Sequence, residues 1–146
     1  MSENNVIDVL QRLIIEREWG LEFSKEAIKD LRYYEKTGLV ETILAAILEG
    51  HSNPLPKEDG GTGTLLGKDR ETGDGRPALY WKLRSIGIRI VYGLEPPITE
   101  GNRVIKKKNV LVLVIGNRRN KEVYHTAVKR LTKYRKRLSG PRHFKP

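Results

Sequence analysis

Two arginines, a lysine and a tyrosine in the second half of the chain form a set that could act on a phosphodiester. Arg89 and Arg118 could hold a phosphate bidentately and stabilise the negative charge that gathers on its oxygens. Lys82 and Tyr124 could move a proton. These residue types suit RNA cleavage, in which the ribose 2′-OH loses a proton, attacks the adjacent phosphate and expels a 5′-oxygen. No metal and no other cofactor is then required.

The residue types alone leave the general base open between Tyr124 and Lys82. Like charge from the neighbouring arginines should lower the pKa of Lys82, and cations beside a tyrosine favour its ionised form. Tyr124 also shares an apolar stripe with Val123 and Ala127, so it could instead belong to the core.

Further basic and aromatic residues are candidates for contacting RNA. Tyr80 could stack on a splayed base, whereas the adjacent Trp81 should point into the core by strand alternation. The basic face of residues 129–137 is expected to bind RNA or an acidic partner rather than to catalyse. The candidates for RNA binding are Tyr80, Arg84, Arg119, Lys121, Lys129 and Lys133.

The basic residues are concentrated in the second half of the chain. Residues 1–75 hold 9 Lys/Arg against 15 Asp/Glu, a net charge of −6, whereas residues 76–146 hold 19 against 3, a net charge of +16. Solubility alone requires no such segregation. A field of this kind attracts polyanions without reading their sequence, which indicates nucleic acid or an acidic protein as the partner.

Cysteine and membrane-spanning patterns are both missing from the sequence. With no Cys, the chain has no disulfide, thiolate nucleophile or cysteine-based zinc site, and its three His have no metal-ligand spacing. The longest apolar run, Val110 to Ile115, is too short to cross a bilayer, and residues 1–15 lack a basic leader followed by an apolar block. We expect a cytoplasmic protein without a metal.

Hydrophobic periodicity predicts the elements of the first half. Apolar residues recur at steps of three and four over residues 3–14, which predicts a short amphipathic helix. The period changes to two from Ile15 to Phe23, which predicts a half-buried strand. Ser24 is suited to cap a helix that ends near Gly38, and a second helix should end at Gly50. A helical hairpin is the result.

Residues 51–77 are rich in glycine and proline and predict a long mobile loop. A phosphate-binding loop is not expected there, because five residues separate Gly61 from Gly67 and Asp69, rather than Ser or Thr, follows Lys68. An acidic side chain at that position would repel a nucleotide's phosphates.

Apolar and polar residues alternate after the loop, which predicts a sheet whose central strand comes late in the chain. Residues 79–84 and 88–94 should form a hairpin with one basic face, joined by a turn at 85–87. After a longer connection, Val110 to Ile115 reads as a central strand, and residues 123–138 trace the stripe of a final helix. The order of elements predicts an α+β fold, an antiparallel twisted sheet packed by the helical hairpin and the C-terminal helix, with an extra N-terminal helix.

Six segments of this chain resemble the RelE/ParE toxin family in their order and spacing. They are 23–27 (FSKEA), 30–32 (DLR), 81–92 (WKLRSIGIRIVY), 110–118 (VLVLVIGNR), 122–124 (EVY) and 127–131 (AVKRL). The resemblance implies a toxin domain over residues 15–138, with a helical extension at 1–14, a long loop at 51–77, an insertion at 95–109 and a tail at 139–146. It also implies a toxin that cleaves messenger RNA on the ribosome and is neutralised by a cognate acidic antitoxin in a hetero-oligomer.

The resemblance places Lys82, Arg89, Arg118 and Tyr124 on positions that ribonuclease members of the family use. Some members carry a second lysine where this chain has Tyr80, which favours Tyr124 as the base with Lys82 as the supporting charge. His125 is expected to be solvated or to contact the antitoxin. Two alternatives remain, a family member that inhibits DNA gyrase and a catalytically silent RNA-binding protein.

Overall fold

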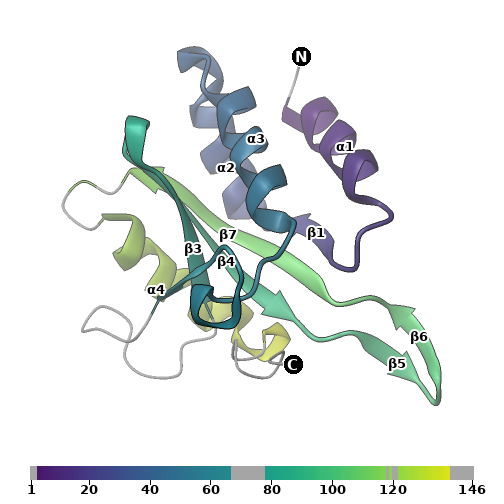
Figure 1. Cartoon of the computed structure of the whole chain (residues 1–146). Coiled ribbons are helices and arrows are strands. Elements are labelled where there is room, and N and C mark those ends of the chain that lie inside the picture. The colour runs from purple at the N-terminus through teal and green to yellow at the C-terminus, as the bar shows by residue number, and fades with distance from the viewer. Residues whose placement is uncertain (1–2, 67–77, 118, 120–121, 139–146) are drawn as a thin grey trace.

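A five-stranded sheet lies at the centre of the fold (Figure 1). The computed structural model describes residues 3–66, 78–117, 119 and 122–138. The strands of the sheet are β1 (Gly20–Phe23), β2 (Thr64–Leu66), β3 (Ala78–Leu83), β4 (Ile88–Glu95) and β7 (Asn109–Asn117). Their spatial order is β1-β7-β4-β3-β2, and β1 runs parallel to β7 whereas the other neighbours are antiparallel. The predicted α+β class is confirmed, with this one parallel pair added to an otherwise antiparallel sheet.

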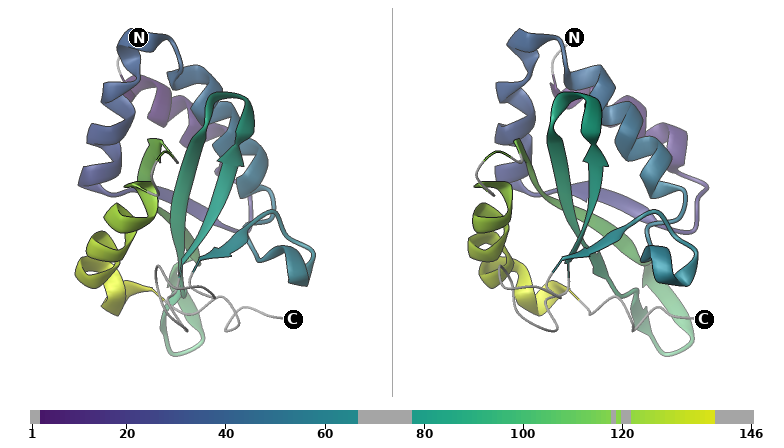
Figure 2. Two further views of the ribbon diagram at one scale, coloured as in Figure 1. Left: turned by 90° about the vertical axis from the view of Figure 1, so that its left-hand side faces the viewer. Right: turned by 60° about the vertical axis from the view of Figure 1, so that its left-hand side comes forward.

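Helices cover both faces of the sheet (Figure 2). Their bounds are α1 Glu3–Ile14, α2 Lys25–Tyr33, α3 Val40–His51 and α4 Glu122–Tyr134. The first three pack on one face, and α4 packs on the other through Val123, Ala127 and Leu131. Residues 110–115 are buried throughout because β7 lies between these two layers, as its unbroken apolar run predicted. None of the helices in the described part of the chain is long and apolar enough to span a membrane.

The N-terminal elements follow the predicted pattern with one correction. The Ser24 hydroxyl accepts the Ala27 N–H at 3.0 Å and caps α2, as predicted. The predicted strand from Ile15 to Phe23 is wrong over its first five residues, since β1 begins only at Gly20. The chain turns there because the Arg17 N–H bonds to the Ile14 carbonyl, and the Arg17 guanidinium donates to the Leu48 carbonyl at 2.8 Å. Side-chain bonds to α3 thus replace strand pairing.

Gly50 lies inside α3 and does not end it, contrary to the prediction. A Cβ built at Gly50 would lie 2.4 Å from Cε2 of Trp81, so the absent side chain lets the helix approach β3. The helix ends after His51 without a left-handed residue, because Ser52 remains in the right-handed region.

Gly50→Ala should therefore destabilise the fold, although the same change inside an unobstructed helix stabilises it. We expect a loss of about 1–3 kcal/mol in the free energy of unfolding, the usual cost of overpacking. Urea denaturation of the parent and the variant measures it. A gain of about 0.5–1 kcal/mol, the ordinary helix effect of alanine over glycine, would contradict the close approach.

Two segments predicted as irregular connections contain regular structure. Residues 52–66 of the predicted mobile loop form a 3₁₀ turn at Lys57–Asp59 followed by β2, while residues 67–77 lie outside the described residues. The 95–109 insertion forms a two-stranded hairpin, β5 (Ile98–Glu100) and β6 (Arg103–Lys106), which projects beyond the main sheet (Figure 1). Its base is tied down, because the Lys107 ammonium donates to the carbonyls of Ile15 and Arg17.

Glu26 joins the first turn of α2 to the end of α4. Its carboxylate accepts hydrogen bonds from Lys133 Nζ at 2.6 Å and from Tyr134 Oη at 2.7 Å. The bond from Lys133, reinforced by that from Tyr134, lowers the pKa of Glu26 from 4.5 to about 2.

This pairing predicts a pH dependence of stability. A carboxyl group whose pKa is depressed by folding stabilises the protein above its unfolded pKa and loses that contribution as the pH falls through the folded value. The Glu26→Gln variant should therefore be less stable than the parent near neutrality, and the gap should narrow as the pH falls from about 4.5 toward about 2. Urea midpoints of both proteins across this range measure the gap. A gap independent of pH would contradict the pairing.

Candidate active site

Strand pairing places Lys82 directly opposite Arg89. The two residues are Cα partners in the antiparallel β3–β4 ladder, and the alternate positions Trp81 and Ile90 belong to the core on the other face. Lys82 and Arg89 therefore lie on the face that α4 covers. Tyr124, in the first turn of α4, contacts Arg89 on this face. Three of the four predicted catalytic residues therefore lie together.

Arg89 is the buried centre of this group. Only 7% of its surface is exposed. Its Nε donates to the Tyr124 hydroxyl oxygen at 3.4 Å, and its Nη1 donates to the Ile88 carbonyl oxygen at 3.4 Å. No carboxylate among the described residues forms an ion pair with it. A buried guanidinium with only neutral acceptors keeps its charge available for an incoming anion.

Tyr80 connects the side chains around Arg89. Its ring packs edge-on against that of Tyr124, with centroids 5.5 Å apart and planes at 67°. The Lys82 ammonium lies 5.7 Å from the centroid of the same ring. Lys82 and Tyr124 thus both contact the Tyr80 ring, and Arg89 neighbours both of them. The aromatic pair fixes the tyrosine hydroxyl relative to the guanidinium.

The Lys82 ammonium is a stronger acid than an ordinary lysine. Partial burial lowers its pKa below 10.5, and the positive charges of Arg84, Lys57 and Arg89 lower it further. The lowering by like charge was expected from the sequence, and Lys57 is the neighbour that the sequence did not suggest.

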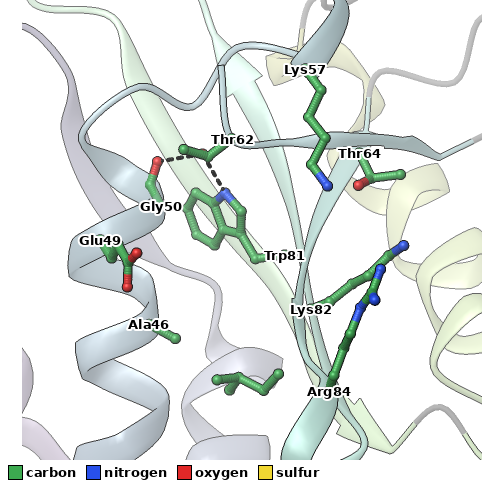
Figure 3. Close-up of a pocket in the computed structure, with 10 residues that line it drawn as sticks. Ala46, Glu49, Gly50, Lys57, Thr62, Thr64, Trp81, Lys82 and Arg84 are labelled. Atoms are coloured by element: carbon green, nitrogen blue, oxygen red, sulfur yellow. Dashed lines mark hydrogen bonds between the residues drawn. The ribbon is translucent and has the colours of Figure 1, made fainter. Parts of the chain in front are cut away.

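A cavity of about 510 Å³ opens beside Lys82, at the edge of β3 (Figure 3). It is bounded by the second half of α3 on one side and by the segment from Lys57 to Thr64 on another. The Trp81 indole forms part of its wall and donates from Nε1 to the Thr62 hydroxyl at 2.9 Å. Trp81 itself is 5% exposed, which confirms that it points into the core. The residues that line the cavity are Ala46, Glu49, Gly50, Lys57, Thr62, Thr64, Trp81, Lys82, Leu83 and Arg84.

The other predicted RNA-binding residues are spread over several surfaces. Arg84 lies at the cavity, and Arg119 lies beside the β3–β4 turn, near Gly87. Lys129 is exposed on α4, as is His125, in line with the expectation for the histidine. Arg118 and Lys121 lie outside the described residues.

Lys133 is already engaged in the fold, because its ammonium pairs with Glu26. It holds α4 to α2 in the free protein. An RNA-binding role for Lys133 would therefore compete with this contact.

Lys57 lies near the site although the sequence pattern does not indicate it. It lies in a glycine-rich stretch with no periodicity, and its position depends on the backbone hydrogen bond from its N–H to the Gly63 carbonyl. The signal in the sequence was charge, since Lys57 is the only Lys or Arg between Lys36 and Lys68.

Comparisons with known proteins give one structural likeness. No protein-family model matches the chain, and no curated protein matches it. Among solved structures, the chain is similar to the isolated RelE toxin of E. coli, with 26% sequence identity and a TM-score of 0.46. The match covers 77% of this chain and 98% of that one.

Proposed function

We propose that this chain is the toxin of a toxin–antitoxin pair and cleaves messenger RNA on the ribosome by attack of a ribose 2′-OH on the adjacent phosphate. The observation that carries the proposal is Arg89, a buried guanidinium without a carboxylate partner among the described residues, set between Lys82 and Tyr124. The sequence resemblance to the RelE/ParE family and the basic second half of the chain support the ribosome and an acidic antitoxin as partners.

Each step of the reaction has a residue that suits it. The phosphate binds at Arg89, whose Nη atoms stabilise the charge that grows on the non-bridging oxygens. Tyr124 takes the proton of the 2′-OH in the step in which it enters as the phenolate and leaves as the neutral phenol, and Arg89 donates to the accepting oxygen. Lys82 gives a proton to the departing 5′-oxygen. The P–O5′ bond breaks as the P–O2′ bond forms, which leaves a 2′,3′-cyclic phosphate and a 5′-hydroxyl. We propose Arg118 as a second phosphate ligand on its sequence position.

Purified protein incubated with ribosomes and a short message tests this function. We expect cleaved message, with a 2′,3′-cyclic phosphate on the upstream fragment, and no cleavage at a position where a 2′-deoxynucleotide replaces the attacking ribose. Intact message throughout would overturn the proposal. Intact message together with loss of DNA supercoiling by gyrase would favour the gyrase inhibitor instead.

The lowered pKa of Lys82 predicts how the cleavage rate falls at alkaline pH, which is the alkaline limb of the pH–rate profile. If Lys82 is the proton donor, the rate should fall as the pH rises through a value below 10.5, because the ammonium loses its proton there. Lys82→Arg keeps the charge but releases no proton in this range. We expect it to cleave about 100-fold more slowly, without the alkaline limb.

Single-turnover rates of the parent and Lys82→Arg between pH 6 and 10 measure this effect, with enzyme-free RNA at each pH as the control. An unchanged alkaline limb in Lys82→Arg would assign the proton to another group.

A further inference from the structure

The cavity at the β3 edge exists because β2 pairs with only part of β3. Thr64 pairs with Tyr80, and β2 continues from there toward Ala78. On the side of β3 away from β4, no strand of the described residues therefore pairs with Trp81 to Leu83. The segment before Thr64 instead turns away and closes the far side of the cavity. A space of about 510 Å³ remains, within the range of about 300–1,000 Å³ of ligand pockets.

Three cations line this space from different elements. Lys57 comes from the 3₁₀ turn, Lys82 from β3 and Arg84 from the turn after β3. Figure 3 shows the Lys57 side chain reaching from the upper segment toward the side where Lys82 and Arg84 lie. None of the carboxylates that the structure describes forms an ion pair with any of the three. Three like charges against the single carboxylate of Glu49 in the lining favour an anion in this cavity.

The backbone that carries Lys57 is held in place. Its N–H donates to the Gly63 carbonyl at 2.8 Å, and the Gly63 N–H donates to the Leu55 carbonyl at 3.0 Å. The Thr62 hydroxyl lies 2.7 Å from the Gly50 carbonyl oxygen, which ties the segment to α3 (Figure 3). Lys57 therefore extends from a fixed base, which reduces the ordering that an anion would have to impose.

The wall formed by α3 is acidic, in contrast to the basic strand side of the cavity. It presents Ala46, Gly50 and the exposed carboxylate of Glu49. Glu49 repels a phosphate from the helix side and leaves the strand side, with its cations, as the place for it. A nucleotide in the cavity would consequently point its phosphate toward Lys57 and Arg84 and its sugar and base toward α3.

We propose that this cavity binds one nucleotide of single-stranded RNA next to the scissile phosphate, with its phosphate on Lys57 and Arg84. The proposal rests on the proposed function, because Lys82 belongs both to the cavity and to the group around Arg89. An RNA chain that has one phosphate at Arg89 would run past Lys82, and its next nucleotide would then lie in the cavity. Lys57 is then a substrate-binding residue and not a catalytic one.

Binding of a short 2′-O-methyl oligoribonucleotide to the full chain tests the site without requiring cleavage. We expect Lys57→Gln and Arg84→Gln each to weaken binding and to reduce the slope of log K against log salt by about 0.7, the value for one lost phosphate contact on a single strand. Lys29→Gln is the matched control, because Lys29 is exposed on α2 and outside the cavity. Thermal unfolding confirms that each variant is folded.

The outcomes separate this site from the proposed function. A parent that fails to bind the oligonucleotide, or a Lys57→Gln variant that binds like Lys29→Gln, overturns the site even if the parent cleaves message on ribosomes. Lys57-dependent binding by a parent that never cleaves message supports the site and overturns the ribonuclease. If Lys57→Gln weakens binding of poly-glutamate and leaves RNA binding unchanged, the cavity serves an acidic protein segment and the proposal is wrong.

Discussion

Arg89→Ala is expected to reduce the rate of message cleavage on ribosomes by about 100- to 1,000-fold, the usual cost of removing one preorganised donor to a developing oxyanion. The guanidinium is buried, has no carboxylate partner among the described residues and donates to the Tyr124 oxygen. Its interaction with the phosphate should be strongest in the transition state. The loss should therefore appear in the single-turnover rate more than in affinity for the ribosome.

Two further variants make the Arg89 result specific. Arg89→Lys keeps a positive charge but cannot form two parallel bonds to a phosphate, so it should remain at least tenfold slower than the parent. Arg103→Ala removes an exposed arginine from β6 and should cleave at the parental rate. Urea denaturation of all three separates catalysis from folding. Equal losses in rate and in ribosome affinity for Arg89→Ala would contradict the assigned role.

Tyr124→Phe is expected to slow cleavage by about 100- to 10,000-fold, the contribution of a positioned general base. The change removes only the hydroxyl, and the edge-on packing of the ring on Tyr80 can persist. The lost bond from Arg89 should cost about 1 kcal/mol of stability or less, because it is long at 3.4 Å. Tyr124→Phe should therefore lower the cleavage rate strongly while it lowers the urea midpoint only slightly.

Tyr33→Phe is the matched control for the tyrosine, because Tyr33 is 74% exposed and far along the chain from the site. It should leave the cleavage rate unchanged. A Tyr124→Phe protein that retains the parental rate would show that Tyr124 serves packing, as its place on the apolar stripe also allows, and would move the base to another residue.

The elements that the sequence predicted well are those that depend on local pattern. The 3–14 helix, the cap at Ser24 and the buried strand at residues 110–115 follow from periodicity and side-chain chemistry within one element. The hairpin between β3 and β4 follows from alternation and a turn that ends at Gly87 with φ of 67°. Each of these features can form without knowledge of distant residues.

The features that the sequence missed depend on contacts between distant elements. Gly50 resembles a helix stop, and only the neighbouring Trp81 explains its place inside α3. The alternation from Ile15 to Trp19 resembles a strand, yet Arg17 bonds to α3 instead. β2 follows a stretch of glycines and forms only because β3 is available to pair with it.

The candidate site divides in the same way. The proximity of Lys82 and Arg89 follows from the hairpin register, and the position of Tyr124 follows from a helix that starts after β7. The hydrogen bond from Arg89 to Tyr124 and the place of Lys57 beside the site depend on packing between layers, which no local pattern encodes. Arg118 lies outside the described residues, and its role as a phosphate ligand stays a prediction.

Mapping of message 5′ ends in cells tests the central claim most directly. The comparison is between cells that express the parent chain and cells that express an Arg89→Ala, Arg118→Ala double variant at equal protein level. The parent should produce new 5′-hydroxyl ends within translated coding regions, and the double variant should produce none. Identical 5′-end maps for the two proteins, in growth-arrested cells or in unaffected ones, would contradict a ribonuclease centred on Arg89.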